Sequence, residues 1–233
     1  MEAVSDRARE LWVQVAGSGA RFAFDVSVTV APESRLCPAG WAGIVVIDGK
    51  VLATAPDEGA ARLMEEALGG LGAETLTSAE VLRRRLAVGD IRGPATLAYL
   101  DAGDFRPTAG VVEALEPGDH GVRQFRAGTA PDDLEESGIE EISTPAFVVR
   151  EGGQVVAAAG YRDWPGDTAH LSVLTAPAAR GRGLARRAAS AAVGHALAEG
   201  KLPQWRARVE ASRRVARALG FRELGAQVSL RLT

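Results

Sequence analysis

The most informative part of the chain is the segment Val173-Leu174-Thr175-Ala176-Pro177-Ala178-Ala179-Arg180-Gly181-Arg182-Gly183-Leu184-Ala185. An apolar strand runs into a proline turn, and an Arg/Gly loop then opens directly into an alanine-rich helix. Glycines let a backbone approach a ligand closely. The first-turn N–H groups of a helix, at the positive end of its dipole, favour an anion. The segment therefore predicts a cradle for a diphosphate. For the loop alone, a glycine-rich turn that only caps a core helix is an equal alternative.

The common nucleotide motifs do not fit this loop. A P-loop needs Lys-Ser or Lys-Thr after its glycines, and a dinucleotide fingerprint needs a third glycine. The loop Gly181-Arg182-Gly183-Leu184-Ala185-Arg186 has neither feature. The tripeptide Gly17-Ser18-Gly19 also lacks the third glycine, and no convincing strand precedes it. We therefore expect an anion site of another kind.

A second segment, further along the chain, reads Ser212-Arg213-Arg214-Val215-Ala216-Arg217-Ala218-Leu219-Gly220-Phe221. The residues from Arg180 to Ala185 match the R/Q-x-x-G-x-G/A signature of the GNAT superfamily, in which a proline commonly lies where Pro177 stands. The second segment looks like the family's second conserved block, which ends in Leu-Gly-Phe. With a helix and a strand between the two blocks, as in the family, residues 121–233 resemble a GNAT acyltransferase domain.

This resemblance implies an α/β (α+β) fold: a mixed, mostly antiparallel sheet flanked by helices and splayed where acyl-CoA enters. We expect the GNAT-like domain to span residues 121–233. The turn-rich segment Glu116-Pro117-Gly118-Asp119-His120-Gly121 marks its boundary. Residues 1–118 would form an N-terminal α/β domain without a signature of its own. The order of its elements is compatible with a degenerate second copy of the GNAT fold or with a lid over the acceptor site.

Apolar periodicity and turn residues predict the individual elements. Asp48-Gly49 between two apolar runs predicts a hairpin over 43–53. Ser78 is a cap candidate for the helix that follows, and Thr77-x-x-Glu80 has the spacing of a capping box. The other helices expected are 2–16, 58–68, 78–86, 132–137, 183–199 and 212–219. The other strands expected are 22–30, 95–100, 122–126, 146–150, 154–161, 169–175, 204–209 and 227–232.

The resemblance also implies roles for single residues. The backbone of Val173, Leu174 and Thr175 would hydrogen-bond the pantetheine arm of acetyl-CoA as an added strand does. Backbone amides of the loop would hold the pyrophosphate, with charge added by Arg182 and Arg186. The expected cofactor-binding residues are Val173, Leu174, Thr175, Arg180, Gly181, Arg182, Gly183, Leu184, Ala185 and Ser212.

The chain departs from the family pattern at two positions. Many members carry an asparagine where this chain has Val209, and a tyrosine that acts as general acid where it has Ala216. His170, on the strand before the loop, is the candidate base, because histidine is well tuned for proton transfer near neutral pH. Ser212 is the candidate donor to the leaving thiolate. A structural histidine and a helix N-cap serine are the plain alternatives for these two residues.

Other polar residues carry weaker expectations. Asp163 and Asp167 lie in one loop, where they would either bind a cationic acceptor or form a plain turn. His195 is expected to pack on the long helix or lie at its surface, and His120 is expected to be solvated in the linker.

Composition limits the classes of function. The chain has 233 residues, of which 46% are hydrophobic and 24% charged, which is ordinary for a soluble globular protein. No apolar run approaches the ~20 residues that span a bilayer, and the N-terminus lacks the features of a signal peptide. We therefore expect a cytoplasmic protein without a membrane partner. Cys37 is the only cysteine, so neither an internal disulfide nor a cysteine-based metal cluster is expected, and we expect no metal cofactor.

Charge is unevenly distributed along the chain, although the net charge is only −3. Residues 180–222 contain eleven Lys or Arg and two acids, whereas residues 101–141 contain eleven acids and three arginines. This asymmetry favours an anionic ligand near the C-terminal segment. A nucleic-acid partner is not expected, because aromatic residues are not interleaved with the arginines of 212–217.

Together these features predict an N-acetyltransferase that moves an acetyl group from acetyl-CoA to an amine by direct attack. The acceptor would be a small-molecule or peptide amine. The alternative is a CoA-binding sensor or scaffold that has lost catalysis, as the departures at Val209 and Ala216 suggest. Monomer and homodimer both remain open.

Overall fold

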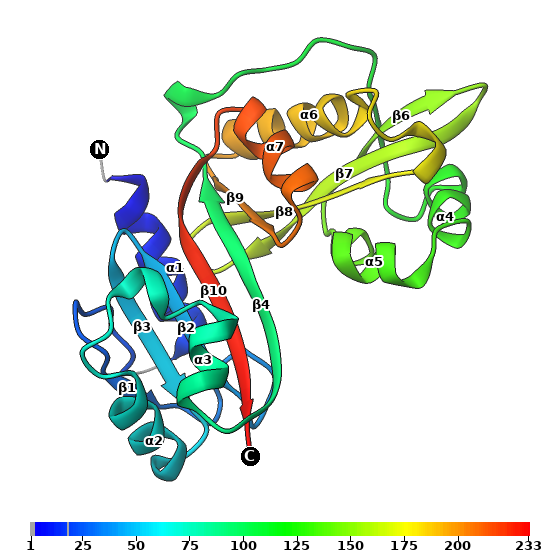
Figure 1. Ribbon diagram of the computed structural model, residues 1–233. Helices are drawn as coiled ribbons and strands as arrows, with labels where there is room; N and C mark the ends of the chain where they lie inside the picture. The colour runs from blue at the N-terminus through cyan, green and yellow to red at the C-terminus, as the bar shows by residue number, and fades with distance from the viewer. Residues whose placement is uncertain (1–2, 18) are drawn as a thin grey trace. The chain divides into compact units, whose positions relative to one another are not determined.

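The computed structural model describes residues 3–17 and 19–233 (Figure 1). Glu2, the first residue of the first expected helix, and Ser18 of the Gly17-Ser18-Gly19 tripeptide lie outside the described residues. The chain forms two compact units. The first comprises residues 1–98 and 223–233, and the second comprises residues 99–222. Among the helices of the described part, none is long and apolar enough to cross a membrane.

The first unit is a five-stranded sheet with helices on both faces. Its strands follow the order β1-β3-β2-β10-β4. Its elements are α1 (Val4–Ala16), β1 (Val28–Val30), β2 (Ala42–Ile47), β3 (Lys50–Ala55), α2 (Glu58–Leu68), α3 (Ala79–Arg85), β4 (Val88–Tyr99) and β10 (Arg222–Leu232), with a 3-10 turn at Ala73–Thr75.

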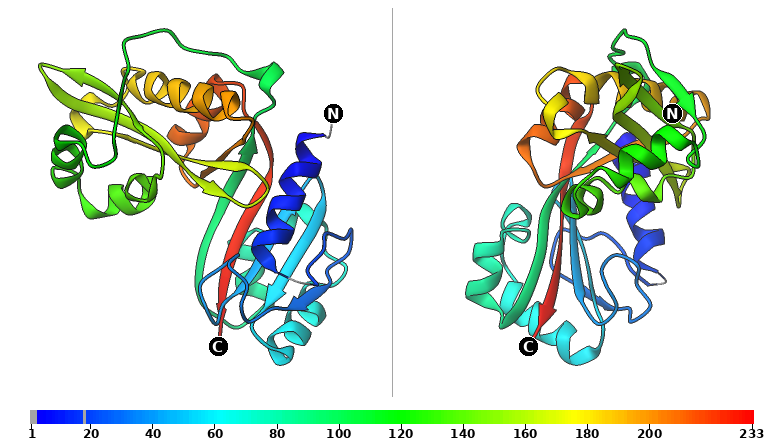
Figure 2. Two further views of the ribbon diagram at one scale, coloured as in Figure 1. Left: turned by 180° about the vertical axis from the view of Figure 1, so that it is seen from behind. Right: turned by 90° about the vertical axis from the view of Figure 1, so that its right-hand side faces the viewer.

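The β2–β3 hairpin confirms the prediction made from Asp48-Gly49. Both turn residues have positive φ angles, 46° at Asp48 and 72° at Gly49, as a tight primed turn requires. Every residue of β2 is buried, because α1 covers one face of the sheet and α2 and α3 cover the other (Figure 2). Met64 and Leu82, from the two helices, pack with Ile44 in one core cluster.

The second unit also carries its sheet between helices. Its strand order is β9-β8-β7-β6-β5, antiparallel except for the parallel pair β8–β9. Its elements are β5 (Glu113–Leu115), α4 (His120–Ala127), α5 (Pro131–Ser137), β6 (Ala146–Glu151), β7 (Gln154–Trp164), β8 (Thr168–Thr175), α6 (Leu184–Ala198), β9 (Leu202–Ala207) and α7 (Glu210–Ala218), with 3-10 turns at Ala102–Asp104, Ile139–Glu141 and Pro177–Ala179.

Helix α6 lies on one face of this sheet and α4 and α5 lie on the other (Figure 1). The buried side of α6 is mostly alanine, including Ala188, Ala189 and Ala192, and such small side chains let a helix pack close to a sheet. On the other face, Val122 and Phe125 of α4 join a core cluster with Ile139 and Ile142. The fold class expected from the sequence, a mixed and mostly antiparallel sheet flanked by helices, is therefore confirmed.

Two sequence-based element predictions are wrong. Residues 122–126 form part of α4 rather than a strand, because Asp119 caps a helix there by accepting a hydrogen bond from Gly121 N at 2.7 Å. Val122 and Phe125, three residues apart, share its buried face. Of the strand expected over 22–30, only β1 forms, apart from an isolated bridge at Ala23.

The cap of α3 is the expected Ser78, but the expected capping box is absent. Ser78 is its N-cap, accepting from Val81 N at 3.4 Å, so the capping box expected at Thr77 does not form.

At the other end of the chain, β10 pairs with β2, with Gln227 opposite Val45. The last strand therefore belongs to the first unit, and the turn at 116–121, where we expected the boundary, lies inside the second unit.

Candidate functional site: a cavity between two splayed strands

The central feature of the second unit is the divergence of β8 from β9. The two strands pair in parallel only from Thr168 opposite Leu202 to His170 opposite Gln204. Strand β8 continues to Thr175 and β9 to Ala207. Over these residues β8 still pairs with β7 on its other side. One edge of β8 is therefore left open to a ligand.

A cavity of about 620 Å³ lies along this open edge. Residues of α5, β8, β9, α7 and the loop that opens α6 surround it, all within the second unit. The lining residues are Asp133, Glu136, Ser137, Val173, Leu174, Thr175, Ala179, Arg180, Gly181, Gly183, Leu184, Ala185, Arg186, Trp205, Arg206, Val209, Ala211, Ser212, Arg214 and Val215.

The hydrogen bonds of β8 indicate which main-chain groups face the open edge. Alternate residues of a strand direct their N–H and C=O groups to opposite sides. Ala176 N bonds Val156 O, on the β7 side, at 2.9 Å. The adjacent residue, Thr175, directs its carbonyl away from β7, where Arg180 Nε donates to it at 3.2 Å. By the same alternation, the N–H groups of Val173 and Thr175 point toward the cavity.

The loop before α6 lines the same cavity with exposed backbone. Gly181 and Gly183 have φ angles of 77° and 76°, a region that favours glycine. A Cβ atom added at either position would meet nothing within 4 Å. The first bond of the helix runs from Arg187 N to Gly183 O at 3.2 Å. Helix geometry therefore leaves the N–H groups of the preceding turn, from Leu184 onward, without an intrahelical acceptor.

Comparison with known proteins finds a family match in the same segment of the chain that forms most of the cavity. The family model described as GNAT acetyltransferase matches residues 144–226, the part of the chain that contains both splayed strands and the loop. Residues 144–226 therefore belong to the GNAT superfamily. A search of curated proteins found no match to the sequence.

Solved structures extend the similarity in fold. A GCN5-related N-acetyltransferase-like protein from Streptococcus suis is 16% identical, with a TM-score of 0.50 over 97% of this chain and 98% of that one. A GNAT-family acetyltransferase from Colwellia psychrerythraea is 13% identical, with a TM-score of 0.51 over 78% of this chain and 76% of that one. Another, from Novosphingobium aromaticivorans, is 25% identical, with a TM-score of 0.48 over 61% of this chain. The chain spans 65% of the length of that protein, less than two thirds.

Nearly all of the residues expected to bind the cofactor line this cavity. The exception is Arg182, whose guanidinium bonds both carboxylate oxygens of Glu151 at 2.6 and 2.8 Å. Arg186, four residues on, does line the cavity. Arg180 bonds Asp133 of α5 at 2.7 Å.

Ser212 also lines the cavity but does not cap its helix. The N-cap of α7 is Val209, and Ser212 lies within the first turn. Its Oγ accepts a hydrogen bond from the indole nitrogen of Trp205 at 2.9 Å. The alternative explanation of Ser212 as an N-cap serine is therefore wrong.

His170 lies on β8 but is not among the residues that line the cavity. Its Nδ1 bonds Gln204 Oε1 at 2.7 Å, and its ring stacks on Trp164 with centroids 4.1 Å apart. Desolvation, aided by the nearby charges of Arg206 and Arg162, lowers the pKa of His170 to about 3. The ring therefore stays neutral at neutral pH and is a weak proton acceptor, so this placement does not support its role as a base.

The two acids expected in one loop lie in different elements, Asp163 in β7 and Asp167 in the turn after it. Asp163 bonds the ammonium of Lys201 at 2.9 Å. Asp167 forms part of a turn, with a φ angle of 48°, and its carbonyl accepts from Leu202 N at 2.8 Å. A plain turn accounts for Asp167, whereas Asp163 is a strand residue whose carboxylate pairs with Lys201.

The other two histidines lie outside the cavity lining. His195 packs within α6, where its Nδ1 bonds the hydroxyl of Tyr161 at 2.9 Å and its ring contacts Phe147. This agrees with the packing role expected from the sequence. His120 is exposed to solvent, as expected, but it is the first residue of α4 instead of lying in a linker.

Sequence reasoning missed the contribution of α5. Its acids Asp133 and Glu136 line the cavity and form ion pairs with Arg180 and Arg208, on the loop before α6 and the loop after β9. The sequence predicts a helix here, but no motif marks its acids as cavity residues.

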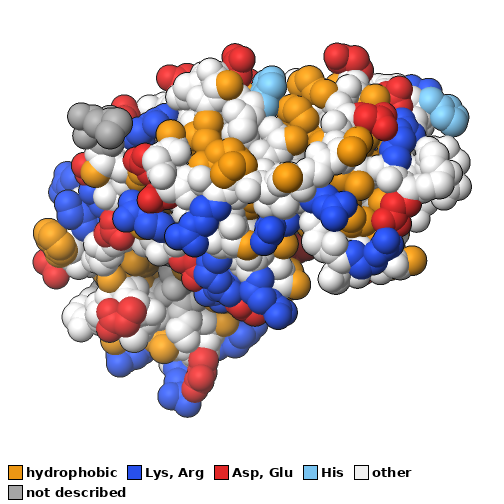
Figure 3. All heavy atoms as spheres, turned by 90° about the horizontal axis from the view of Figure 1, so that it is seen from above, with side chains coloured by type: hydrophobic (Ala, Val, Ile, Leu, Met, Phe, Trp, Pro, Cys, Tyr) orange, Lys and Arg blue, Asp and Glu red, His pale blue; other side chains and the backbone are white. Residues whose placement is uncertain are grey.

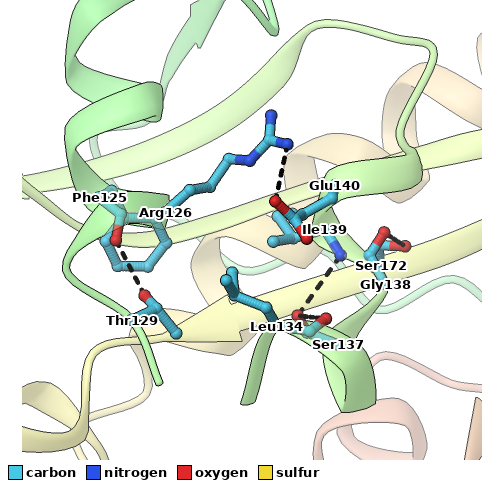
Figure 4. A network of polar contacts seen from close by, with 9 residues as sticks. All are labelled: Phe125, Arg126, Thr129, Leu134, Ser137, Gly138, Ile139, Glu140 and Ser172. Atoms are coloured by element: carbon cyan, nitrogen blue, oxygen red, sulfur yellow. Dashed lines mark hydrogen bonds and ion pairs between the residues drawn. The ribbon is translucent and has the colours of Figure 1, made fainter. Parts of the chain in front are cut away.

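Helix α5 and the turn after it are also held to β8 and α4. Ser172 of β8 donates to Gly138 O at 3.1 Å, and Arg126 of α4 bonds Glu140 at 3.1 Å (Figure 4). These contacts hold α5 on one face of the sheet, beside the open edge of β8.

Proposed function

We propose that this GNAT protein transfers an acetyl group from acetyl-CoA to the amine of a small molecule or peptide. The observation that carries the proposal is the coincidence of two features on one cavity. An open strand edge at Val173 and Thr175 lies beside the exposed amides of the loop that opens α6. The first feature suits the amide-bearing pantetheine arm, and the second suits a diphosphate.

The residues present fit such a ligand. The loop glycines leave open space where a side chain would stand. Thr175 Oγ1 is buried and has no hydrogen-bond partner among the described residues, although buried hydroxyls are usually paired. In this assignment Val173, Leu174 and Thr175 hold the pantetheine arm, and the amides from Arg180 to Ala185 hold the pyrophosphate. Acetyl-CoA supplies a thioester carbonyl that an amine attacks.

The side chains at the cavity supply orientation and charge stabilisation. Ser212 donates a hydrogen bond to the sulfur as the carbon–sulfur bond breaks, in place of the tyrosine that many members carry where this chain has Ala216. Thiols have reference pKa values near ~8.5, so the thiolate leaves without a strong acid. We assign no side-chain base, because His170 is too weakly basic. The proton of the attacking amine passes to water.

A thiol-release assay tests this proposal. Acetyl-CoA is incubated with the protein and a panel of small amines and peptide N-termini, and free CoA is measured with a thiol reagent. We expect release that depends on one class of amine, together with CoA binding detected by calorimetry.

Val209 and Ala216 favour a second candidate, a CoA-binding sensor without catalysis. Tight CoA binding with no release on any amine would support it. No CoA binding at all would refute both functions.

A further inference from the structure

Trp205 and Ser212 form a contact inside the cavity that the proposed function does not yet explain. Both residues line the cavity, one from β9 and the other from the first turn of α7. The distance from Trp205 Nε1 to Ser212 Oγ is 2.9 Å. An indole nitrogen is only a donor. The serine oxygen therefore accepts this bond, and its own hydrogen must point elsewhere.

The indole is held rigidly enough to orient that hydroxyl. Trp205 is 4% exposed, and its ring meets Phe221 edge-on with centroids 5.5 Å apart. Phe221, at the end of the second family block, is itself 4% exposed. Between the cavity and Phe221 the indole has little freedom to turn its N–H away from Ser212.

The hydroxyl hydrogen of Ser212 is available to a group in the cavity that Ser212 lines. A serine in a helix often donates to the carbonyl four residues earlier, but in the described part of the chain the structure gives Ser212 Oγ no acceptor. The partner that remains is a group inside the cavity. The indole bond occupies one lone pair of the oxygen, which favours donation of the hydroxyl hydrogen to a ligand.

We infer that Trp205 is a positioning residue that fixes Ser212 as a hydrogen-bond donor to the sulfur of the leaving thiol. This inference rests on the proposed function. The amine nitrogen bonds to the carbonyl carbon, the carbon–sulfur bond breaks, and its electron pair passes to sulfur. Ser212 keeps its proton and stabilises the thiolate, which takes a proton from solvent after release, while water accepts the proton of the amine. Trp205 acts through Ser212.

The test compares three variants in single-turnover acetyl transfer: Ser212→Ala, Trp205→Phe and the double variant. Trp205→Phe removes the N–H but keeps an aromatic ring against Phe221. We expect each single variant to lower the rate roughly tenfold, the size of one lost hydrogen bond, with the acetyl-CoA dissociation constant little changed. The double variant should be no slower than Ser212→Ala, because both changes remove the same interaction.

Control variants distinguish a positioning role of Trp205 from a purely structural one. Ser212→Thr keeps the hydroxyl and should recover most of the rate lost in Ser212→Ala. Trp12→Phe, a matched substitution at a buried tryptophan of the first unit, should leave the rate unchanged. Thermal melting checks that each variant is folded.

The outcomes distinguish the inference from the function on which it rests. Additive losses in the double variant, or a Trp205→Phe effect confined to acetyl-CoA binding, would overturn the inference while leaving the function standing. No turnover by the unsubstituted protein would refute the function and the inference together.

Discussion

Ala185 is the best single position at which to probe the anion cradle. It lies in the first turn of α6 and lines the cavity. Gly183 is less suitable, because its positive φ angle would strain any side chain. We expect Ala185→Glu to weaken CoA binding by at least tenfold, since it places a negative charge beside the proposed pyrophosphate site. An acid near a helix N-terminus is otherwise stabilising, so the fold should persist.

Ala185→Gln is the matched control, with nearly the same bulk and no charge. Calorimetric titration of CoA into both variants measures the difference. Equal affinities for the two variants would mean that no phosphate lies at the start of α6.

The partly buried imidazole of His170, bonded to Gln204 and stacked on Trp164, predicts a pH dependence of stability. Its pKa is lowered to about 3 in the folded protein, from an ordinary value of 6.5. Between these values the unfolded chain binds a proton that the folded chain does not, so stability falls as pH drops below 6.5. At pH 5 the loss is at most about 2 kcal/mol, from 1.4 kcal/mol per pKa unit.

Urea unfolding at pH 7 and pH 5 measures this loss. In His170→Gln the difference in free energy of unfolding between the two pH values should be smaller than in the unsubstituted protein. The same difference in both proteins would show that His170 is not held neutral by burial.

At the scale of elements, α5 bears directly on the cavity. Its Asp133 holds the guanidinium of Arg180 at 2.7 Å, and both residues line the cavity. A bound diphosphate would compete with this carboxylate for Arg180. We expect Asp133→Asn to tighten CoA binding a few-fold, because it releases the guanidinium from this ion pair and removes a negative charge at the cavity.

The neighbouring acid supplies the control for this prediction. Asp132 is exposed and does not line the cavity, so Asp132→Asn should change the affinity much less. Calorimetry at low and at high salt measures both variants, and the gain in Asp133→Asn should shrink as salt screens the charges. Weaker CoA binding by Asp133→Asn would instead mean that the carboxylate helps to form the site.

Elements also differ in how far local sequence predicts them. The β2–β3 hairpin and α6 form as expected, because Asp48-Gly49 and the glycine-opened, alanine-rich helix specify their own backbone conformations. Residues 122–126 were expected to be a strand but lie in α4. Their few apolar residues fit both the two-residue repeat of a strand and the 3.6-residue repeat of a helix. The cap at Asp119 and the burial of Val122 and Phe125 favour the helix.

At the scale of the whole molecule, the last strand completes the first unit. Strand β10 lies between β2 and β4 in the sheet, and Val228 and Leu230 are fully buried in the core cluster of that unit. We expect a chain that ends at Arg222 to lose the fold of the first unit. Hydrogen exchange should then show fast exchange in β2 and β3.

Removal of Thr233 alone, beyond the end of β10, is the control and should leave that protection intact. Protected β2 amides in the shorter chain would show that the first unit folds without its last strand.

Over the face seen from above, acidic and basic side chains are interspersed with apolar ones (Figure 3). The charge asymmetry along the chain therefore does not become one large field of a single sign on that face.

The sequence by itself determined the glycine loop that begins α6 and the GNAT resemblance. A glycine loop and a helix start present backbone amides whatever surrounds them, so Gly181, Gly183 and the helix after them can be read locally. Tertiary structure alone decided the environment of the side chains. Asp133 meets Arg180 because segments far apart in the sequence pack together. Ser212 meets Trp205, and His170 stacks on Trp164, because neighbouring elements fold back on one another. Hydrogen-bond partners and desolvation depend on those neighbours, and no pattern in the local sequence encodes them.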